Sequence, residues 1–222
     1  PVPSRTPALT PMYGVTIDTI SNINAIVDSL RNLARRPTTR VVFDEYVPAS
    51  YYSSAVSKIS EVSDVMGEIL DSFYVKNYSV VDYEQRTTEY FEALKDSVDI
   101  WEIGNEINGE WLGDTPSVVK KMKAAYDIIK AKGGRTSLTL YYNENCWKYP
   151  SEEEFAWAEK NVPLDMKQNL DYIFLSYYED DCNNLKPNWT NAFEKLEKLF
   201  PNSKIGFGEV GTIHASQKAE FI

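Results

Sequence analysis

Apolar residues along the chain follow two alternating patterns. Short runs rich in Val, Ile, Phe and Tyr are separated by longer stretches in which apolar residues recur every three or four positions. The first pattern predicts buried strands and the second predicts amphipathic helices. The expected strands are Tyr13–Ile17, Arg40–Phe43, Val65–Leu70, Ile100–Gly104, Ser137–Tyr141, Tyr172–Ser176 and Ile205–Gly208. The expected helices are Asn22–Ala34, Ser53–Ser63, Tyr83–Ser97, Ser117–Lys132 and Thr190–Phe200.

The regular spacing of the strands indicates the fold class. Successive strands start about 24 to 37 residues apart, which suits repeated strand–helix units and a parallel sheet. An open doubly wound sheet would carry a glycine-rich phosphate loop after its first strand, and none is found there. We therefore expect one α/β domain over residues 1–222, a (β/α)8 barrel of the TIM type. Its eighth strand is not found before Ile222, and His214–Ile222 is expected to begin the helix after the seventh strand.

Composition excludes several functional classes. Of the 222 residues, 43% are hydrophobic and 25% are charged, which is typical of a globular protein. The net charge of −10 argues against a nucleic-acid partner, and no apolar run is long enough to span a bilayer. His214 is the single histidine, so a metal site built from several histidines is excluded and a Ser–His catalytic pair is disfavoured. We expect no metal and no cofactor.

Two glutamates stand where apolar strands end. Glu106 closes the segment Trp101–Glu106 and Glu209 closes Ile205–Glu209. They are 103 residues apart over three units, about 34 per unit, so they should occupy the same level of the barrel. The chemistry of (β/α)8 barrels is found at the C-terminal ends of the strands. Two facing carboxyl groups, one protonated and one ionised, suit the hydrolysis of a glycosidic bond.

The segment Trp101-Glu102-Ile103-Gly104-Asn105-Glu106 resembles the Asn-Glu motif of clan A glycoside hydrolases, which are (β/α)8 retaining glycosidases. The resemblance implies that Glu106 is the acid/base, that Glu209 is the nucleophile and that Asn105 binds the sugar 2-hydroxyl. It also implies a Tyr after the sixth strand that contacts the nucleophile, for which Tyr178 is preferred to Tyr177. Two features common in the clan have no counterpart, because no Arg follows the second strand and no His lies near the sixth.

Further residues at the same end of the barrel are candidates for sugar binding. Trp111 and Trp147 lie in the loops after the fourth and fifth strands, and a sugar ring can stack its apolar face on such side chains. Asn143 lies beside Trp147, and Glu45, at the end of the second strand, could bind hydroxyl groups or form a salt bridge.

The two cysteines, Cys146 and Cys182, fall in the loops after neighbouring strands. A disulfide between them is geometrically plausible and would fit a secreted or extracytoplasmic protein, whereas two free thiols remain the alternative. The acidic run Glu179–Asn184 lacks the alternation of a calcium loop and indicates a solvated loop instead.

We expect a retaining glycosidase that cleaves β-linked oligo- or polysaccharides with Glu106 and Glu209. The alternative is a catalytically inactive, carbohydrate-binding barrel. An esterase is disfavoured because no GxSxG motif is present. The sequence leaves open the glycan, the choice between endo and exo cleavage, and the oligomeric state.

Overall fold

The computed structural model describes residues 11–182 and 185–211. Seven parallel strands form one sheet in the order β1-β2-β3-β4-β5-β6-β7, so each strand pairs with its neighbours in sequence. The strands are β1 (Gly14–Ile17), β2 (Thr38–Val42), β3 (Asp64–Glu68), β4 (Ile100–Glu102), β5 (Thr136–Tyr141), β6 (Tyr172–Tyr178) and β7 (Lys204–Gly211). The predicted α/β fold of the TIM type is therefore confirmed.

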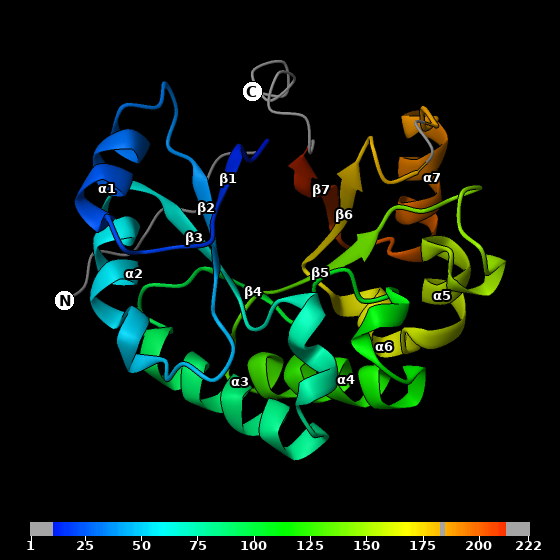
Figure 1. Ribbon diagram of the computed structural model, residues 1–222, viewed down its shortest axis with the longest axis horizontal. Helices are drawn as coiled ribbons and strands as arrows, with labels where there is room; N and C mark the ends of the chain where they lie inside the picture. The colour runs from blue at the N-terminus through cyan, green and yellow to red at the C-terminus, as the bar shows by residue number, and fades with distance from the viewer. Residues whose placement is uncertain (1–10, 183–184, 212–222) are drawn as a thin grey trace.

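Helices follow the strands on the outside of the curved sheet, as Figure 1 shows. They are α1 (Ile23–Arg31), α2 (Ser50–Val62), α3 (Val80–Leu94), α4 (Thr115–Ala131), α5 (Glu154–Asn161), α6 (Leu164–Asn169) and α7 (Trp189–Leu199). Three short 3₁₀ turns are η1 (Ser72–Asn77), η2 (Glu110–Leu112) and η3 (Pro150–Glu152). The seven strands form a nearly closed barrel. Within the described residues β1 and β7 do not pair and no eighth strand–helix unit lies between them, so the barrel stays open there. The helix expected over His214–Ile222 lies outside the described residues.

Local sequence signals explain where the two longest helices begin. The side chain of Ser79 accepts the backbone N–H of Asp82, and Asp82 accepts the backbone N–H of Ser79, which forms a capping box at the start of α3. At the start of α4 the side chain of Asp114 accepts the backbone N–H of Ser117, and Pro116 occupies the first turn. These caps satisfy backbone N–H groups that have no partner inside the helix.

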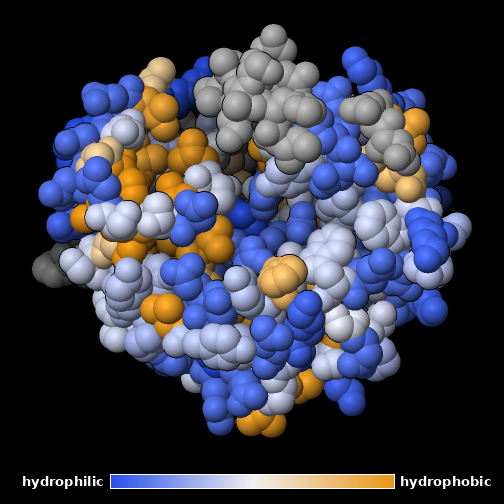
Figure 2. All heavy atoms as spheres, viewed as in Figure 1, coloured by the Kyte–Doolittle hydropathy of each residue, from blue (hydrophilic) through white to orange (hydrophobic). Residues whose placement is uncertain are grey.

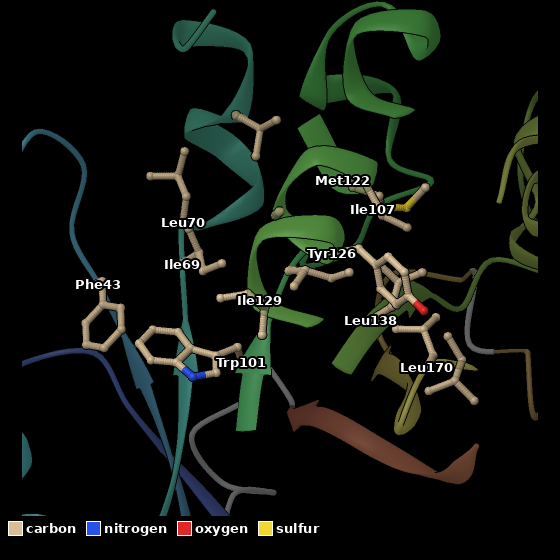
Figure 3. Close-up of a cluster of buried hydrophobic side chains, with 14 of the residues drawn as sticks. Phe43, Ile69, Leu70, Trp101, Ile107, Met122, Tyr126, Ile129, Leu138 and Leu170 are labelled. Atoms are coloured by element: carbon tan, nitrogen blue, oxygen red, sulfur yellow. The ribbon is translucent and has the colours of Figure 1, made fainter. Parts of the chain in front are cut away.

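The core lies between the outer face of the sheet and the helices. Trp101 on β4 is almost wholly buried and packs against Phe91 of α3, with ring centroids 5.4 Å apart. Figure 3 shows Trp101 in one cluster with side chains from helices and strands, among them Ile129 of α4 and Leu138 of β5. Burial of this apolar surface is the main force that holds the helices on the sheet. The polar residues at the C-terminal ends of the strands, such as Glu106 after β4, lie outside this core and are available to bind a ligand.

The sequence missed α5 and α6. These helices have 8 and 6 residues, so each shows too few turns for a helical spacing of apolar residues to stand out. The other five helices and all seven strands agree with the prediction apart from their ends. Strands β6 and β7 extend farther than predicted, to Tyr178 and Gly211, and this extension includes Glu209 in β7.

Candidate active site

Glu106 lies in the loop after β4 with its backbone in the left-handed region, at φ 47°. Few residues other than glycine adopt this conformation, and they are frequent at functional sites. The next residues hold the loop in place. The backbone N–H of Ile107 donates to the carbonyl of Thr139, and the side-chain amide of Asn108 bonds both the N–H and the carbonyl of Tyr141, at 2.7 and 3.0 Å. The chain is thus tied to β5 immediately after Glu106.

Two hydroxyl groups contact the carboxylate of Glu106. Ser176 Oγ on β6 donates to Oε1 at 2.7 Å, and Ser72 Oγ, at the start of η1, donates to Oε2 at 3.0 Å. Trp111 Nε1 donates in turn to Ser72 Oγ at 3.0 Å. Burial raises the pKa of Glu106 to about 7, and the charge of Glu209 acts in the same direction, while the two serine hydrogen bonds oppose the rise. A carboxyl group with such a pKa holds a proton near neutral pH and can donate it.

Glu209 on β7 has a different environment. Arg40 Nη1 donates to its Oε2 at 3.0 Å, and the hydroxyl of Tyr178 donates to its Oε1. Its side chain is 23% exposed, so it is reachable from solvent. A guanidinium and a phenol thus hold this carboxylate by its two oxygens. The Glu209 charge also contributes to the raised pKa of Glu106, so the two groups interact electrostatically.

Arg40 is a residue of the site that the sequence did not reveal. It lies within β2, not after it, and it is buried inside the barrel. Its Nε donates to Glu102 Oε2 at 2.7 Å and its Nη2 lies 3.0 Å from Glu68 Oε2, in addition to the contact with Glu209. Burial raises the pKa of Glu68 well above its ordinary value. The available signal was an arginine within a strand predicted to be buried, Arg40–Phe43, because a buried guanidinium requires partners.

A cavity of about 570 Å³ opens above the two glutamates. Its lining consists of the two glutamates, four aromatic side chains and one aspartate: Glu106, Glu209, Trp111, Tyr141, Trp147, Tyr178 and Asp181. Figure 2 shows mainly hydrophilic residues near the centre of the face in view. Trp111, Tyr141 and Trp147 contact one another edge to face, with ring centroids 5.3 to 6.5 Å apart, and form one aromatic wall. The predicted residues Glu106, Glu209, Tyr178, Trp111 and Trp147 therefore share one cavity.

The other three predicted residues lie outside the cavity lining. Asn105 is buried beside Glu106, and its Oδ1 has no hydrogen-bond partner within the described chain. Asn143 is buried, and its side chain bonds the carbonyl of Glu152 at 3.2 Å and the N–H of Glu154 at 3.0 Å. Glu45 is half-buried, and its charge raises the pKa of Tyr74. Asn143 thus fixes a loop, a role that its position after a strand did not reveal.

Cys146 and Cys182 form a disulfide with a Cα–Cα distance of 5.3 Å, so the bonded alternative is confirmed. Within residues 11–182 and 185–211 no three His, Cys, Asp or Glu side chains form a group suited to a metal ion. His214, Asn183 and Asn184 lie outside these ranges. None of the described helices has the length and apolar character needed to cross a membrane.

Known proteins share this fold at low sequence identity. No protein-family model and no curated protein sequence matches the chain. The GH53 catalytic domain of Ignisphaera aggregans aligns with a TM-score of 0.52 and 17% identity, over 90% of this chain and 62% of that one. A 2,3-dimethylmalate lyase of the PEP mutase/isocitrate lyase superfamily aligns with a TM-score of 0.54 and 12% identity, over 94% and 71%. Identities this low show the barrel fold alone, and this chain spans 62% of the length of the GH53 domain.

Proposed function

We propose that this protein is a retaining glycosidase that cleaves β-linked oligo- or polysaccharides outside the cytoplasm. The observation that carries the proposal is one cavity holding two carboxyl groups in contrasting environments. Glu106 is half-buried with a pKa raised to about 7, whereas Glu209 accepts hydrogen bonds from Arg40 and Tyr178. An acid and an ionised carboxylate are the pair that glycoside hydrolysis needs.

In the first step, Glu106 donates its proton to the glycosidic oxygen as the bond from that oxygen to the anomeric carbon breaks. Glu209 attacks the same carbon and forms a glycosyl ester. In the second step, the ionised Glu106 removes a proton from water, the water oxygen attacks the anomeric carbon, and the ester bond to Glu209 breaks. Both glutamates return to their starting states, and the configuration at the anomeric carbon is retained.

The remaining residues position the sugar and the nucleophile. The Tyr178 hydroxyl and the Arg40 guanidinium hold the Glu209 carboxylate by its two oxygens. Trp111 and Trp147 offer aromatic faces for sugar rings. Asn105, whose Oδ1 lacks a partner within the described chain, is the candidate for a contact with the 2-hydroxyl.

The proposal is tested by hydrolysis of β-linked polysaccharides and aryl β-glycosides, with Glu209→Ala assayed beside the parent chain. We expect turnover of at least one substrate, lost in the variant by several orders of magnitude. If the parent binds saccharides but hydrolyses none of them, the protein is a carbohydrate-binding barrel and the proposal fails. A parent that neither binds nor hydrolyses a glycan excludes both functions.

A further inference from the structure

Asp181 is a carboxylate of the cavity that the proposed reaction does not use. It follows β6 and lines the same cavity as Glu106 and Glu209. The Tyr141 hydroxyl, at the end of β5, donates to Asp181 Oδ2 at 3.3 Å. Asp181 thus stands beside the aromatic wall formed by Trp111, Tyr141 and Trp147.

The position of Asp181 is fixed by the chain on both of its sides. Its backbone N–H donates to the carbonyl of Tyr178 at 3.1 Å. The next residue, Cys182, is bonded to Cys146, which directly precedes Trp147. The disulfide therefore joins the immediate neighbours of Asp181 and Trp147, two residues that line the cavity. Asp181 is exposed, as expected for a solvated acidic loop, and these two connections fix its place at the rim of the cavity.

The ionisable groups with a carboxyl or a basic side chain that line the cavity are all acidic. Its lining includes Glu106, Asp181 and Glu209 and no Lys or Arg from the described chain. The nearby cation, Arg40, is buried, and its Nε, Nη1 and Nη2 contact Glu102, Glu209 and Glu68. A sugar carboxylate would lose water and meet like charges here, whereas hydroxyl groups would meet hydrogen-bond acceptors.

We propose that Asp181 is a specificity residue that selects neutral glycans and rejects uronic-acid glycans, an inference that rests on the proposed function. Its carboxylate accepts hydrogen bonds from adjacent hydroxyls of a sugar unit that lies against the aromatic wall. The same charge repels a carboxylate at C6. Rejection by a like charge is a common means of specificity.

The test compares binding of matched glycan pairs by calorimetry in the full chain carrying Glu106→Gln, which blocks turnover and keeps the charges of Asp181 and Glu209. The probes are β-1,4-linked glucose and mannose hexamers and their C6-oxidised counterparts, the glucuronate and mannuronate hexamers. We expect at least one neutral hexamer to bind about tenfold or more tightly than its uronate counterpart, with the ratio falling as salt screens the repulsion.

Asp181→Asn is the informative variant and Glu179→Gln is its control. Glu179 belongs to the same loop and carries the same charge, but it is not among the residues that line the cavity. We expect Asp181→Asn to weaken neutral binding about tenfold, through loss of a charged acceptor, and to reduce the neutral-to-uronate ratio, while Glu179→Gln changes neither. Equal binding of both members of each pair, absence of binding, or equal effects of the two variants would overturn the inference. Because no step requires hydrolysis, a failure of the glycosidase assay leaves this result interpretable.

Discussion

Glu106, which is half-buried, and Glu154, which is buried, are two glutamates whose pKa values are raised in different surroundings. Burial raises the pKa of Glu106 to about 7 and that of Glu154 to about 8. Glu106 lines an open cavity that it shares with Glu209. Glu154, the first residue of α5, is wholly buried and accepts the backbone N–H of Asn143 at 3.1 Å. A raised pKa therefore does not by itself mark a catalytic acid, which also requires access and a partner.

The largest expected effect separates the two glutamates by activity. We expect Glu106→Gln to lower kcat on an unactivated glycoside by about 10²- to 10⁴-fold, because the leaving oxygen no longer receives a proton. Glu154→Gln should leave kcat within about twofold of the parent, because Glu154 does not line the cavity. Steady-state kinetics on one substrate checks both variants. A large loss in Glu154→Gln alone would reverse the assignment of the acid.

Arg40 provides the second test of the comparison. It places a positive charge beside Glu209 in the cavity, whereas Glu154 accepts a backbone N–H. Arg40→Gln leaves the buried carboxylates of Glu68 and Glu102 without their cation. We expect the free energy of unfolding, measured by urea denaturation, to fall by about 3–5 kcal/mol. Arg40→Lys keeps the positive charge but loses the planar guanidinium with its several N–H donors, so its free energy of unfolding should lie between those of the parent and Arg40→Gln. Parent-like stability in Arg40→Gln would show that this network contributes little.

The pH dependence of stability gives a third effect, which is spread over several pH units. Glu154 has an ordinary pKa of 4.5 when unfolded and about 8 when folded. Between these values the folded state holds more protons, so this group lowers stability as the pH rises. Glu154→Gln should therefore gain stability relative to the parent as the pH rises from about 4.5 to about 8, on the order of 4 kcal/mol. Thermal denaturation across this range checks the expectation, and a constant difference would contradict it.

The smallest expected effect concerns the hydroxyl groups around Glu106. Ser176 Oγ donates to Glu106 and lowers its pKa against the effect of burial. Ser176→Ala should raise the pKa of Glu106 by about 0.7, the equivalent of one hydrogen bond of about 1 kcal/mol. The alkaline limb of kcat/KM, which reports loss of the acid proton, should move to higher pH by the same amount. Ser151→Ala, which alters an exposed hydroxyl, is the control. A limb that stays in place would indicate that another group titrates there.

The sequence predicted the seven strands because each is a short apolar run. It predicted five of the helices because their apolar residues recur every three or four positions over several turns. It also placed Glu106 and Glu209 at strand ends, and the structure puts both into one cavity. It could not locate Ser72 or Ser176, since a hydroxyl that contacts a carboxylate across the barrel leaves no local pattern. Arg40 was not predicted because it lies within β2, whereas the resemblance implied an arginine after that strand.

The roles of Asp181 and Asn143 also could not be predicted from the sequence. Asp181 is exposed, as expected for an acidic run, but the run itself does not reveal that the neighbouring disulfide holds this residue at the cavity. Asn143 follows a strand in the manner of a binding residue, yet its amide is engaged by the backbone around α5, a helix that the sequence did not predict. Roles that depend on contacts between distant segments become visible only in the folded chain.

The central claim is that Glu209 forms a covalent bond to the sugar while Glu106 serves as acid and base. It is tested most directly by mass spectrometry of the Glu106→Gln variant mixed with a dinitrophenyl β-glycoside. This leaving group needs no protonation, so the first step proceeds while the second, which needs a base, is slow. We predict that the protein gains the mass of one glycosyl unit, located on the peptide that contains Glu209. Release of dinitrophenol with no adduct, or an adduct on a different residue, would contradict the assignment of Glu209 as the nucleophile.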